Sequence, residues 1–95
     1  MNYTEYTIYL KNKQVIENCS LNGIDYRPSD EEAMEFYFKI KDESYYKMFL
    51  MCKKRDISKQ TVNLKFSQLR RIGKQEHKDY VMNINEIERI EEIKY

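Results

Sequence analysis

Residues 44–55 have the sequence SYYKMFLMCKKR, in which the apolar residues recur with the spacing of a helix. Four of them fall at positions i, i+3, i+4 and i+7: Tyr45, Met48, Phe49 and Cys52. Asp42 or Ser44 can cap the start of this helix, and the basic run 53–55 suits its C-terminus. Because so short a helix is marginal alone in water, it must pack on a sheet. The segment therefore predicts one amphipathic helix near residues 43–54.

Upstream of this helix, alternating apolar and polar residues predict strands. Residues 6–10 and 14–20 alternate on either side of a turn at 11–13, which is typical of an N-terminal hairpin. The Gly, Pro and Asn residues clustered between 20 and 32 predict one long loop. Residues 34–40 then place an apolar side chain at every second position, which predicts a central strand.

The C-terminal third contains two similar segments, FSQLRRI at 66–72 and INEIERI at 84–90. In each, a strand pattern meets a Ser or Asn that can bond its own backbone two residues on, so each copy predicts strand, tight turn, strand. A helix from Asn85 is the alternative for the second copy. The isoleucines there recur at a strict step of three, which drifts around a helix, and this favours a strand for residues 89–94.

These patterns predict an α+β fold: an N-terminal hairpin, a central strand, one helix over one sheet face, then four C-terminal antiparallel strands. At 95 residues and 11.7 kDa the chain has room for one core, so residues 1–95 form a single domain. The longest run without a charged residue, 18–24, is far shorter than a membrane span, and no signal-peptide pattern follows Met1. We expect a soluble cytoplasmic protein without membrane contact. A tyrosine-rich free sheet edge and a modest core suggest a homodimer.

Charge is segregated along the chain although the formal net charge is only +1. Residues 1–38 hold three basic and seven acidic side chains (−4), residues 39–78 twelve and four (+8), and residues 79–95 two and five (−3). Eight side chains of the middle segment form a candidate phosphate-binding patch: Lys53, Lys54, Arg55, Lys59, Arg70, Arg71, Lys74 and Lys78. The alternative is that basic and acidic strands lie side by side and neutralise each other.

The predicted loop also contains an acidic cluster, Asp30, Glu31 and Glu32, beside Pro28. Clustered acidic residues in a loop are commonly solvated, so this is a weaker candidate for binding a cation or a basic partner. Cys19, Cys52 and His77 are too few for a structural zinc site, and both cysteines suit a reduced core. We expect no metal and no cofactor. No catalytic motif or plausible set of nucleophile, base and oxyanion donors is recognisable, so we predict no catalytic residues and no enzymatic activity.

Residue usage bears on the origin of the gene. Lys, Ile, Tyr and Asn supply 12, 10, 9 and 7 residues, and their codons are A/T-rich, which favours a low-GC bacterium, its phage or a mobile element. Tyrosine also suits protein interfaces. The leading hypothesis is a small non-enzymatic protein that docks on another protein, for example as a phage-encoded inhibitor of a host defence system. The alternative is a nucleic-acid- or nucleotide-binding regulator that uses the basic patch.

Overall fold

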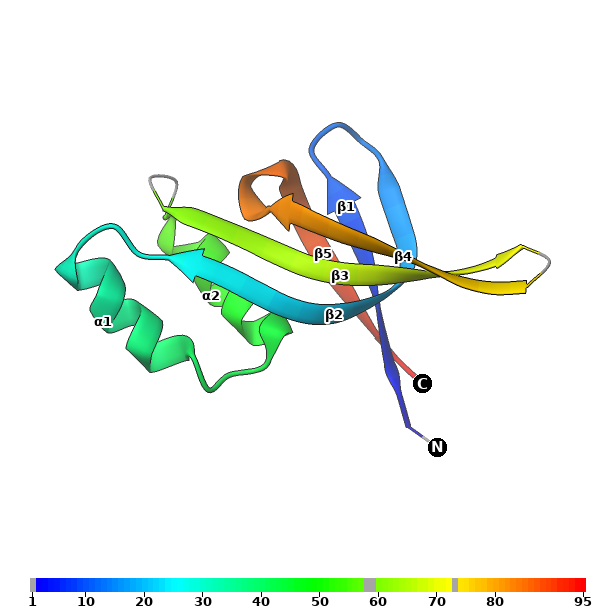
Figure 1. Ribbon diagram of the computed structural model, residues 1–95, viewed down its shortest axis with the longest axis horizontal. Coiled ribbons are helices and arrows are strands. Elements are labelled where there is room, and N and C mark those ends of the chain that lie inside the picture. Colours follow the sequence, from blue (N-terminus) through cyan, green and yellow to red (C-terminus); the bar gives the residue numbers. More distant parts are fainter. Residues whose placement is uncertain (1, 58–59, 73) are drawn as a thin grey trace.

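A computed structural model describes residues 2–57, 60–72 and 74–95, with the side chains of 71, 72, 74 and 75 left aside. Within these ranges five strands form one antiparallel sheet in the order β4-β3-β2-β1-β5 (Figure 1). The strands are β1 (Thr4–Leu10), β2 (Val15–Arg27), β3 (Thr61–Ile72), β4 (Lys74–Asn83) and β5 (Ile87–Lys94). The helices are α1 (Glu31–Ile40) and α2 (Tyr45–Arg55), with a short 3-10 helix, η1 (Ile84–Glu86), before β5. The α+β prediction is confirmed.

The predicted amphipathic helix is confirmed as α2. Ser44 caps it, since its hydroxyl oxygen accepts a hydrogen bond from the Lys47 amide at 3.3 Å. Met48, Phe49 and Cys52 are buried, as the spacing predicted, whereas Tyr45, the first member of the predicted stripe, is exposed. The N-terminal hairpin of β1 and β2 is confirmed as well, and its turn is closed by the Leu10 amide donating to the Gln14 carbonyl at 2.9 Å.

The predicted central strand at 34–40 is wrong, because these residues belong to helix α1. Asp30 caps the helix by accepting from the Ala33 amide at 2.8 Å. Ala33, Phe36 and Ile40 lie on the buried face, whereas Met34 and Phe38 lie on the exposed one. The alternating apolar residues are thus divided between two sides of a helix. A single amphipathic helix was expected, and the structure has two.

The predicted loop at 20–32 is also wrong over most of its length, since β2 continues to Arg27. Asn22-Gly23 forms a β-bulge there: Leu21 pairs with Phe66 and Gly23 with Lys65, so Asn22 is the extra residue. A second irregularity lies between the pairs Tyr6–Cys19 and Ile8–Ile16, where Asn18 has φ 58°. Bulges bend a strand, and in Figure 1 β1 and β5 run at a steep angle to β3 and β4.

Among the described residues, three strands and not four follow α2. The first of the two similar segments does not turn, because the Ser67 hydroxyl donates across the sheet to Asp79 Oδ1 at 2.6 Å and accepts from Asn22, leaving β3 unbroken. In the second segment the chain does turn at η1, but the side chain that bonds the backbone two residues on is Asn83, just before the segment, and not Asn85 as predicted: Asn83 Oδ1 accepts from the Asn85 amide at 2.9 Å. The strand predicted for 89–94 is confirmed within β5.

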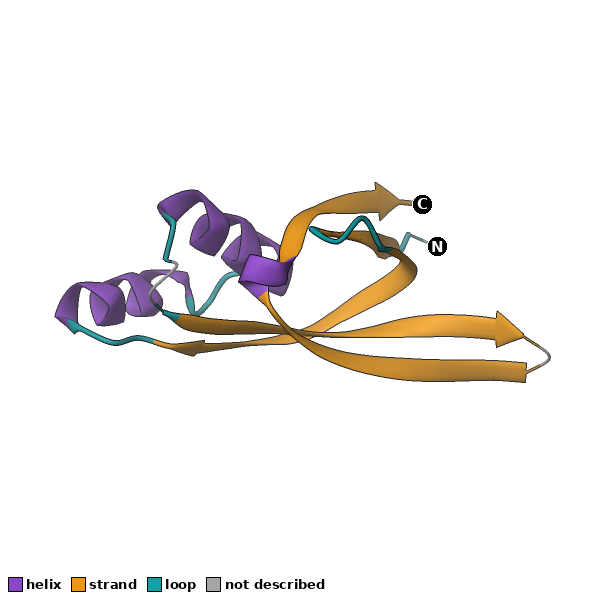
Figure 2. Cartoon of the chain, turned by 90° about the horizontal axis from the view of Figure 1, so that it is seen from above, coloured by secondary structure: helices purple, strands orange, loops and turns teal. Residues whose placement is uncertain are grey.

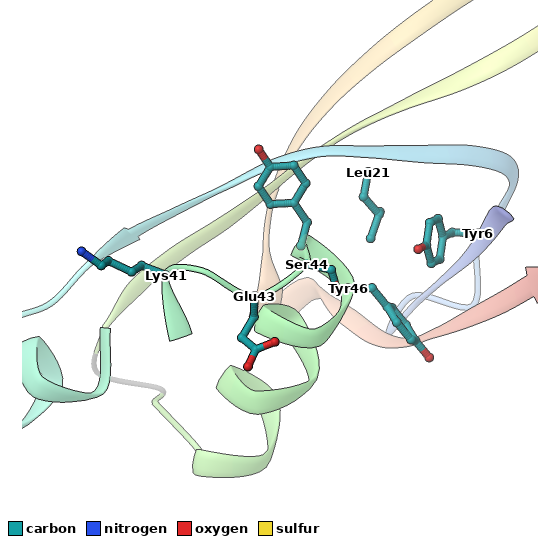
Figure 3. A pocket seen from close by; sticks show the side chains of 7 residues that line it. Tyr6, Leu21, Lys41, Glu43, Ser44 and Tyr46 are labelled. Carbon is teal, nitrogen blue, oxygen red and sulfur yellow. The ribbon is translucent and has the colours of Figure 1, made fainter. Parts of the chain in front are cut away.

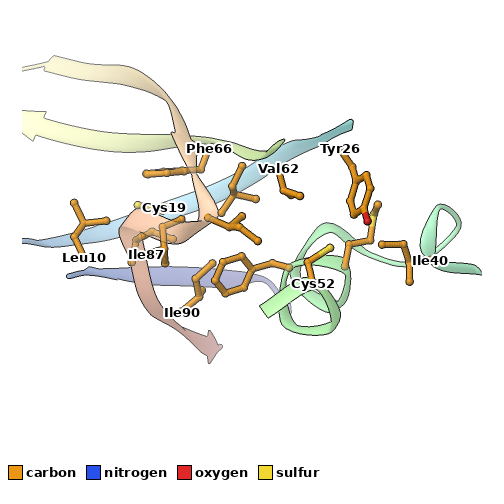
Figure 4. Packing of buried hydrophobic residues seen from close by; sticks show 14 of the residues in the cluster. Leu10, Cys19, Tyr26, Ile40, Cys52, Val62, Phe66, Ile87 and Ile90 are labelled. Atoms are coloured by element: carbon orange, nitrogen blue, oxygen red, sulfur yellow. The ribbon is translucent and has the colours of Figure 1, made fainter. Parts of the chain in front are cut away.

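The core lies between the helices and one face of the sheet. Figure 4 shows side chains from β1, β2, β3, β5 and both helices meeting in a single cluster. The most deeply buried members include Ile8, Phe49, Val62, Phe66 and Ile87. The β3–β4 hairpin extends beyond the helices to one end of the molecule (Figure 2). No helix within the described residues has the length and apolar character needed to cross a membrane.

One buried polar group lacks a partner. The Tyr26 side chain reaches from β2 toward Cys52 and Ile40 (Figure 4), and its ring packs near Phe36 and Tyr37 with centroids 6.4 and 5.6 Å apart. Its hydroxyl accepts and donates no hydrogen bond among the described residues, and burial raises the pKa of Tyr26. A buried hydroxyl without a hydrogen bond reduces stability.

We therefore expect Tyr26→Phe to leave the free energy of unfolding unchanged or to raise it by up to about 1 kcal/mol in urea denaturation. Tyr80→Phe is the matched control, because the Tyr80 hydroxyl donates to Gln68 Oε1 at 3.3 Å and its removal should not stabilise the protein. A loss of more than about 1 kcal/mol in Tyr26→Phe would contradict the expectation, since a loss of that size is typical of a satisfied hydrogen bond.

Candidate functional site

The basic residues of the predicted patch that the structure describes lie in two separate groups. Lys53, Lys54 and Arg55 lie at the end of α2, next to the start of β3, whereas Arg70 and Lys78 lie toward the far end of the β3–β4 hairpin. Ten residues of strand separate Gln60 from Arg70, which corresponds to about 30 Å. Lys59 and the side chains of Arg71 and Lys74 lie outside the described residues.

Lys53 points into the protein. Its Nζ donates to the backbone carbonyls of Ile87 at 2.8 Å and Ile84 at 3.4 Å. Burial, with a smaller contribution from Lys11, lowers the pKa of this ammonium group. Lys53 therefore ties α2 to the turn between β4 and β5, and its charge is directed away from a ligand in solution.

Arg55 connects the two helices. Its guanidinium forms an ion pair with Glu32 at 3.0 Å, and it lies over the Phe36 ring at 4.4 Å from the centroid. Lys54 is exposed beside it. At the other end of the sheet, Lys78 lies over the Tyr80 ring at 5.1 Å. Several members of the predicted patch thus have partners within the chain.

The acidic cluster is the beginning of α1, not a loop or a strand entry. Asp30 is the N-cap, and Glu31 and Glu32 occupy the first turn, where carboxylates interact favourably with the positive end of the helix dipole. Glu32 also forms the ion pair with Arg55. The presence of these three acidic residues is therefore explained largely by their contribution to the stability of α1.

The outer side of α1 carries a feature that the sequence reasoning missed. Met34 is 42% exposed and Phe38 58% exposed, one helical turn apart. Lys41 Nζ lies 5.5 Å from the centre of the Phe38 ring. We call Met34, Phe38 and Lys41 the α1 outer surface. Met34 and Phe38 fall within the central strand predicted for residues 34–40, so their exposure could be recognised only once the helix was known.

Lys41 also borders a pocket of about 420 Å³ between the β1–β2 hairpin and the start of α2 (Figure 3). We call it the aromatic pocket, and its main apolar lining is Tyr6, Leu21, Tyr45 and Tyr46. The Tyr6 and Tyr46 rings lie 5.2 Å apart, and their hydroxyls donate to Glu92 at 3.3 Å and to the Ile90 carbonyl at 3.5 Å. Burial and the nearby Glu92 raise the pKa of Tyr6. These bonds hold two of the rings in place around the pocket.

The cysteines and the histidine, which are the side chains most suited to nucleophilic or acid–base chemistry, do not line the aromatic pocket. Cys19 and Cys52 are buried free thiols in the core, and burial raises the pKa of Cys19 to about 12 and that of Cys52 to about 11. His77 lies in β4 opposite Leu69 and is exposed. Among the described residues, no three or more His, Cys, Asp and Glu side chains gather as a metal site would require.

Comparison with protein-family models, with curated proteins and with solved structures finds no match to this chain.

The contacts of Lys53 predict a stabilising role. Lys53→Met keeps the apolar stem but removes the ammonium that donates to the Ile87 carbonyl and to the Ile84 carbonyl, the latter of which also accepts from the Ile87 amide, so we expect the free energy of unfolding to fall by about 1–2 kcal/mol. Lys54→Met, one residue along and exposed, should change stability by less than about 0.5 kcal/mol. Equal effects of the two substitutions in urea denaturation would contradict the role assigned to Lys53.

Burial of the two thiols makes a prediction about their reactivity. The thiolate is the reactive form, so the native protein should react slowly with a thiol reagent at pH 8, and both cysteines should react at once in denaturant. Because the folded-state pKa values are raised, the unfolded chain loses thiol protons first, and stability should decline as pH rises from about 9 through about 11. Rapid reaction of either thiol in the native protein at pH 8 would contradict the expected protection of the thiols by burial.

Proposed function

We propose that this is a small non-enzymatic protein that acts by docking on a protein partner through the α1 outer surface. The observation that carries the proposal is that α1 is apolar on two sides. Ala33, Phe36 and Ile40 already pack on the protein's own core, yet Met34 and Phe38 on the outer side are left exposed. A helix that is apolar on both sides is normally covered on both.

The neighbourhood of this surface supports the same proposal. Lys41 links Phe38 to the aromatic pocket, so an exposed apolar ridge and a concave tyrosine-rich site adjoin each other. Protein interfaces are enriched in Tyr, Phe and Met, and their binding energy is concentrated in a few large side chains that fill pockets. A partner with a large apolar side chain at the right place can use both features.

The nucleic-acid alternative has less support. Binding a phosphate backbone requires Lys and Arg side chains along one surface. The described members of the basic patch instead form two groups, one at the end of α2 and one toward the far end of the β3–β4 hairpin. Lys53 and Arg55 are further committed to contacts within the chain. A phage or mobile-element origin, and a role as an inhibitor of a host defence system, rest on residue usage alone and remain proposals, as does a homodimer.

The test is a comparison of variants in affinity capture. Met34→Ser with Phe38→Ser removes the apolar ridge without disturbing a buried contact, so circular dichroism should be unchanged. Proteins retained from a lysate of the organism that carries the gene should fall roughly tenfold in abundance relative to wild type, as expected for loss of interface anchors. The matched control is Val81→Ser on β4, an apolar residue that is 67% exposed and far from α1 in sequence.

Equal retention by wild type and the α1 variant, or no specific retention at all, would contradict the proposal. A parallel titration with single- and double-stranded DNA and RNA addresses the alternative. We expect no binding that weakens linearly on a plot of log affinity against log salt; such binding, lost in Arg70→Ala, would favour the nucleic-acid function instead.

A further inference from the structure

We propose that the partner segment that docks on α1 is a basic amphipathic helix. This inference rests on the proposed function and names the chemistry of the partner at the same surface. It comes from the arrangement of charged and apolar side chains along the exposed side of α1.

Two parallel rows run along this side. Met34 and Phe38 are one turn apart, and so are Glu31 and Glu35. Each glutamate precedes an apolar member by three residues, so an acidic row lies directly beside the apolar row. All four side chains are exposed.

The acidic row has no cationic partner within the described part of the chain. Glu32 pairs with Arg55, but Glu31 and Glu35 form no ion pair there. The helix dipole accounts for Glu31 in the first turn, but its effect fades beyond that turn, where Glu35 lies. Like charges at i and i+4 also destabilise a helix. Cations supplied from outside would offset this repulsion.

Nearby lysines do not cancel the row. Lys39 lies one turn beyond Glu35 without forming an ion pair with it among the described residues, and Lys41 lies over the Phe38 ring and forms no ion pair with Glu31 or Glu35 there. The carboxylates therefore face solvent next to an uncovered apolar ridge.

A helix is the element that matches two straight rows. Side chains at i and i+4 of a partner helix form a ridge with the same spacing of about 6 Å along the helix axis, and an apolar ridge bordered by Lys or Arg would meet Met34 and Phe38 together with Glu31 and Glu35. Carboxylates repel phosphates and anionic lipid surfaces, which favours a protein segment as the occupant.

The probe for this inference is a synthetic 18-residue peptide of Leu and Lys patterned as an amphipathic helix, titrated into the whole ¹⁵N-labelled protein. We expect the largest amide shift changes in α1 and an affinity that falls with added salt. A peptide with the same pattern of Leu and Glu should bind at least tenfold more weakly. Glu31→Gln with Glu35→Gln should weaken the Leu/Lys peptide by roughly fivefold, as loss of two exposed ion pairs allows. Lys39→Gln, the matched control on the same helix, should leave binding unchanged or strengthen it.

Failure of the Leu/Lys peptide to bind, binding away from α1, equal binding of both peptides, or no effect of the two Glu→Gln substitutions would each overturn the inference. These outcomes are distinct from failure of the proposed function, which is decided by capture with the Met34 and Phe38 variant. If capture depends on those residues and the charge experiments fail, α1 docks a partner of different chemistry.

Discussion

Burial of the α2 stripe against the inner face of the sheet is the contact on which the rest of the arrangement depends. Phe49 and Cys52 are almost fully inaccessible and share one cluster with Ile8, Phe66 and Ile87 from three strands. Once this helix is fixed, the direction of every residue at its C-terminus is fixed as well. Lys53 is turned toward the carbonyls of the β4–β5 connection, and Arg55 toward α1. The packing that builds the core therefore directs neighbouring basic residues of α2 toward different parts of the protein.

The sequence was sufficient for elements whose local signals agree with each other. Ser44, the apolar spacing and the basic end all indicate α2, and the hairpin has both alternation and a turn. At 34–40 the local signals conflict, because alternating apolar residues fit either a strand or a helix with two apolar sides. Asp30 and the glutamates after it form the pattern of an N-cap and an acidic first turn, which favours the helix.

Other errors arose from long-range contacts. Asn22-Gly23 suits a turn or a bulge, and pairing of β2 with β3 selects the bulge. Ser67 and Asn83 have similar local tendencies, but Ser67 bonds across the sheet to Asp79 whereas Asn83 bonds to the backbone two residues on. The candidate site also depends on how segments distant in the sequence are arranged. Whether the basic residues share a surface depends on how far β3 extends, which no single segment could establish. The exposure of Met34 and Phe38 depends on α1 being a helix.

The pairing of β1 with β5 brings the two ends of the chain together. The Tyr95 amide donates to the Tyr3 carbonyl at 2.9 Å, and the rings of these residues stack with centroids 4.6 Å apart. The strands are antiparallel and both chain ends lie at the same end of the pair (Figure 1). A force that pulls the two ends apart therefore acts across the strands and loads their hydrogen bonds one after another. The protein would open under tension like a zipper, from Tyr3 and Tyr95 inward, at a lower force than a pair loaded in shear.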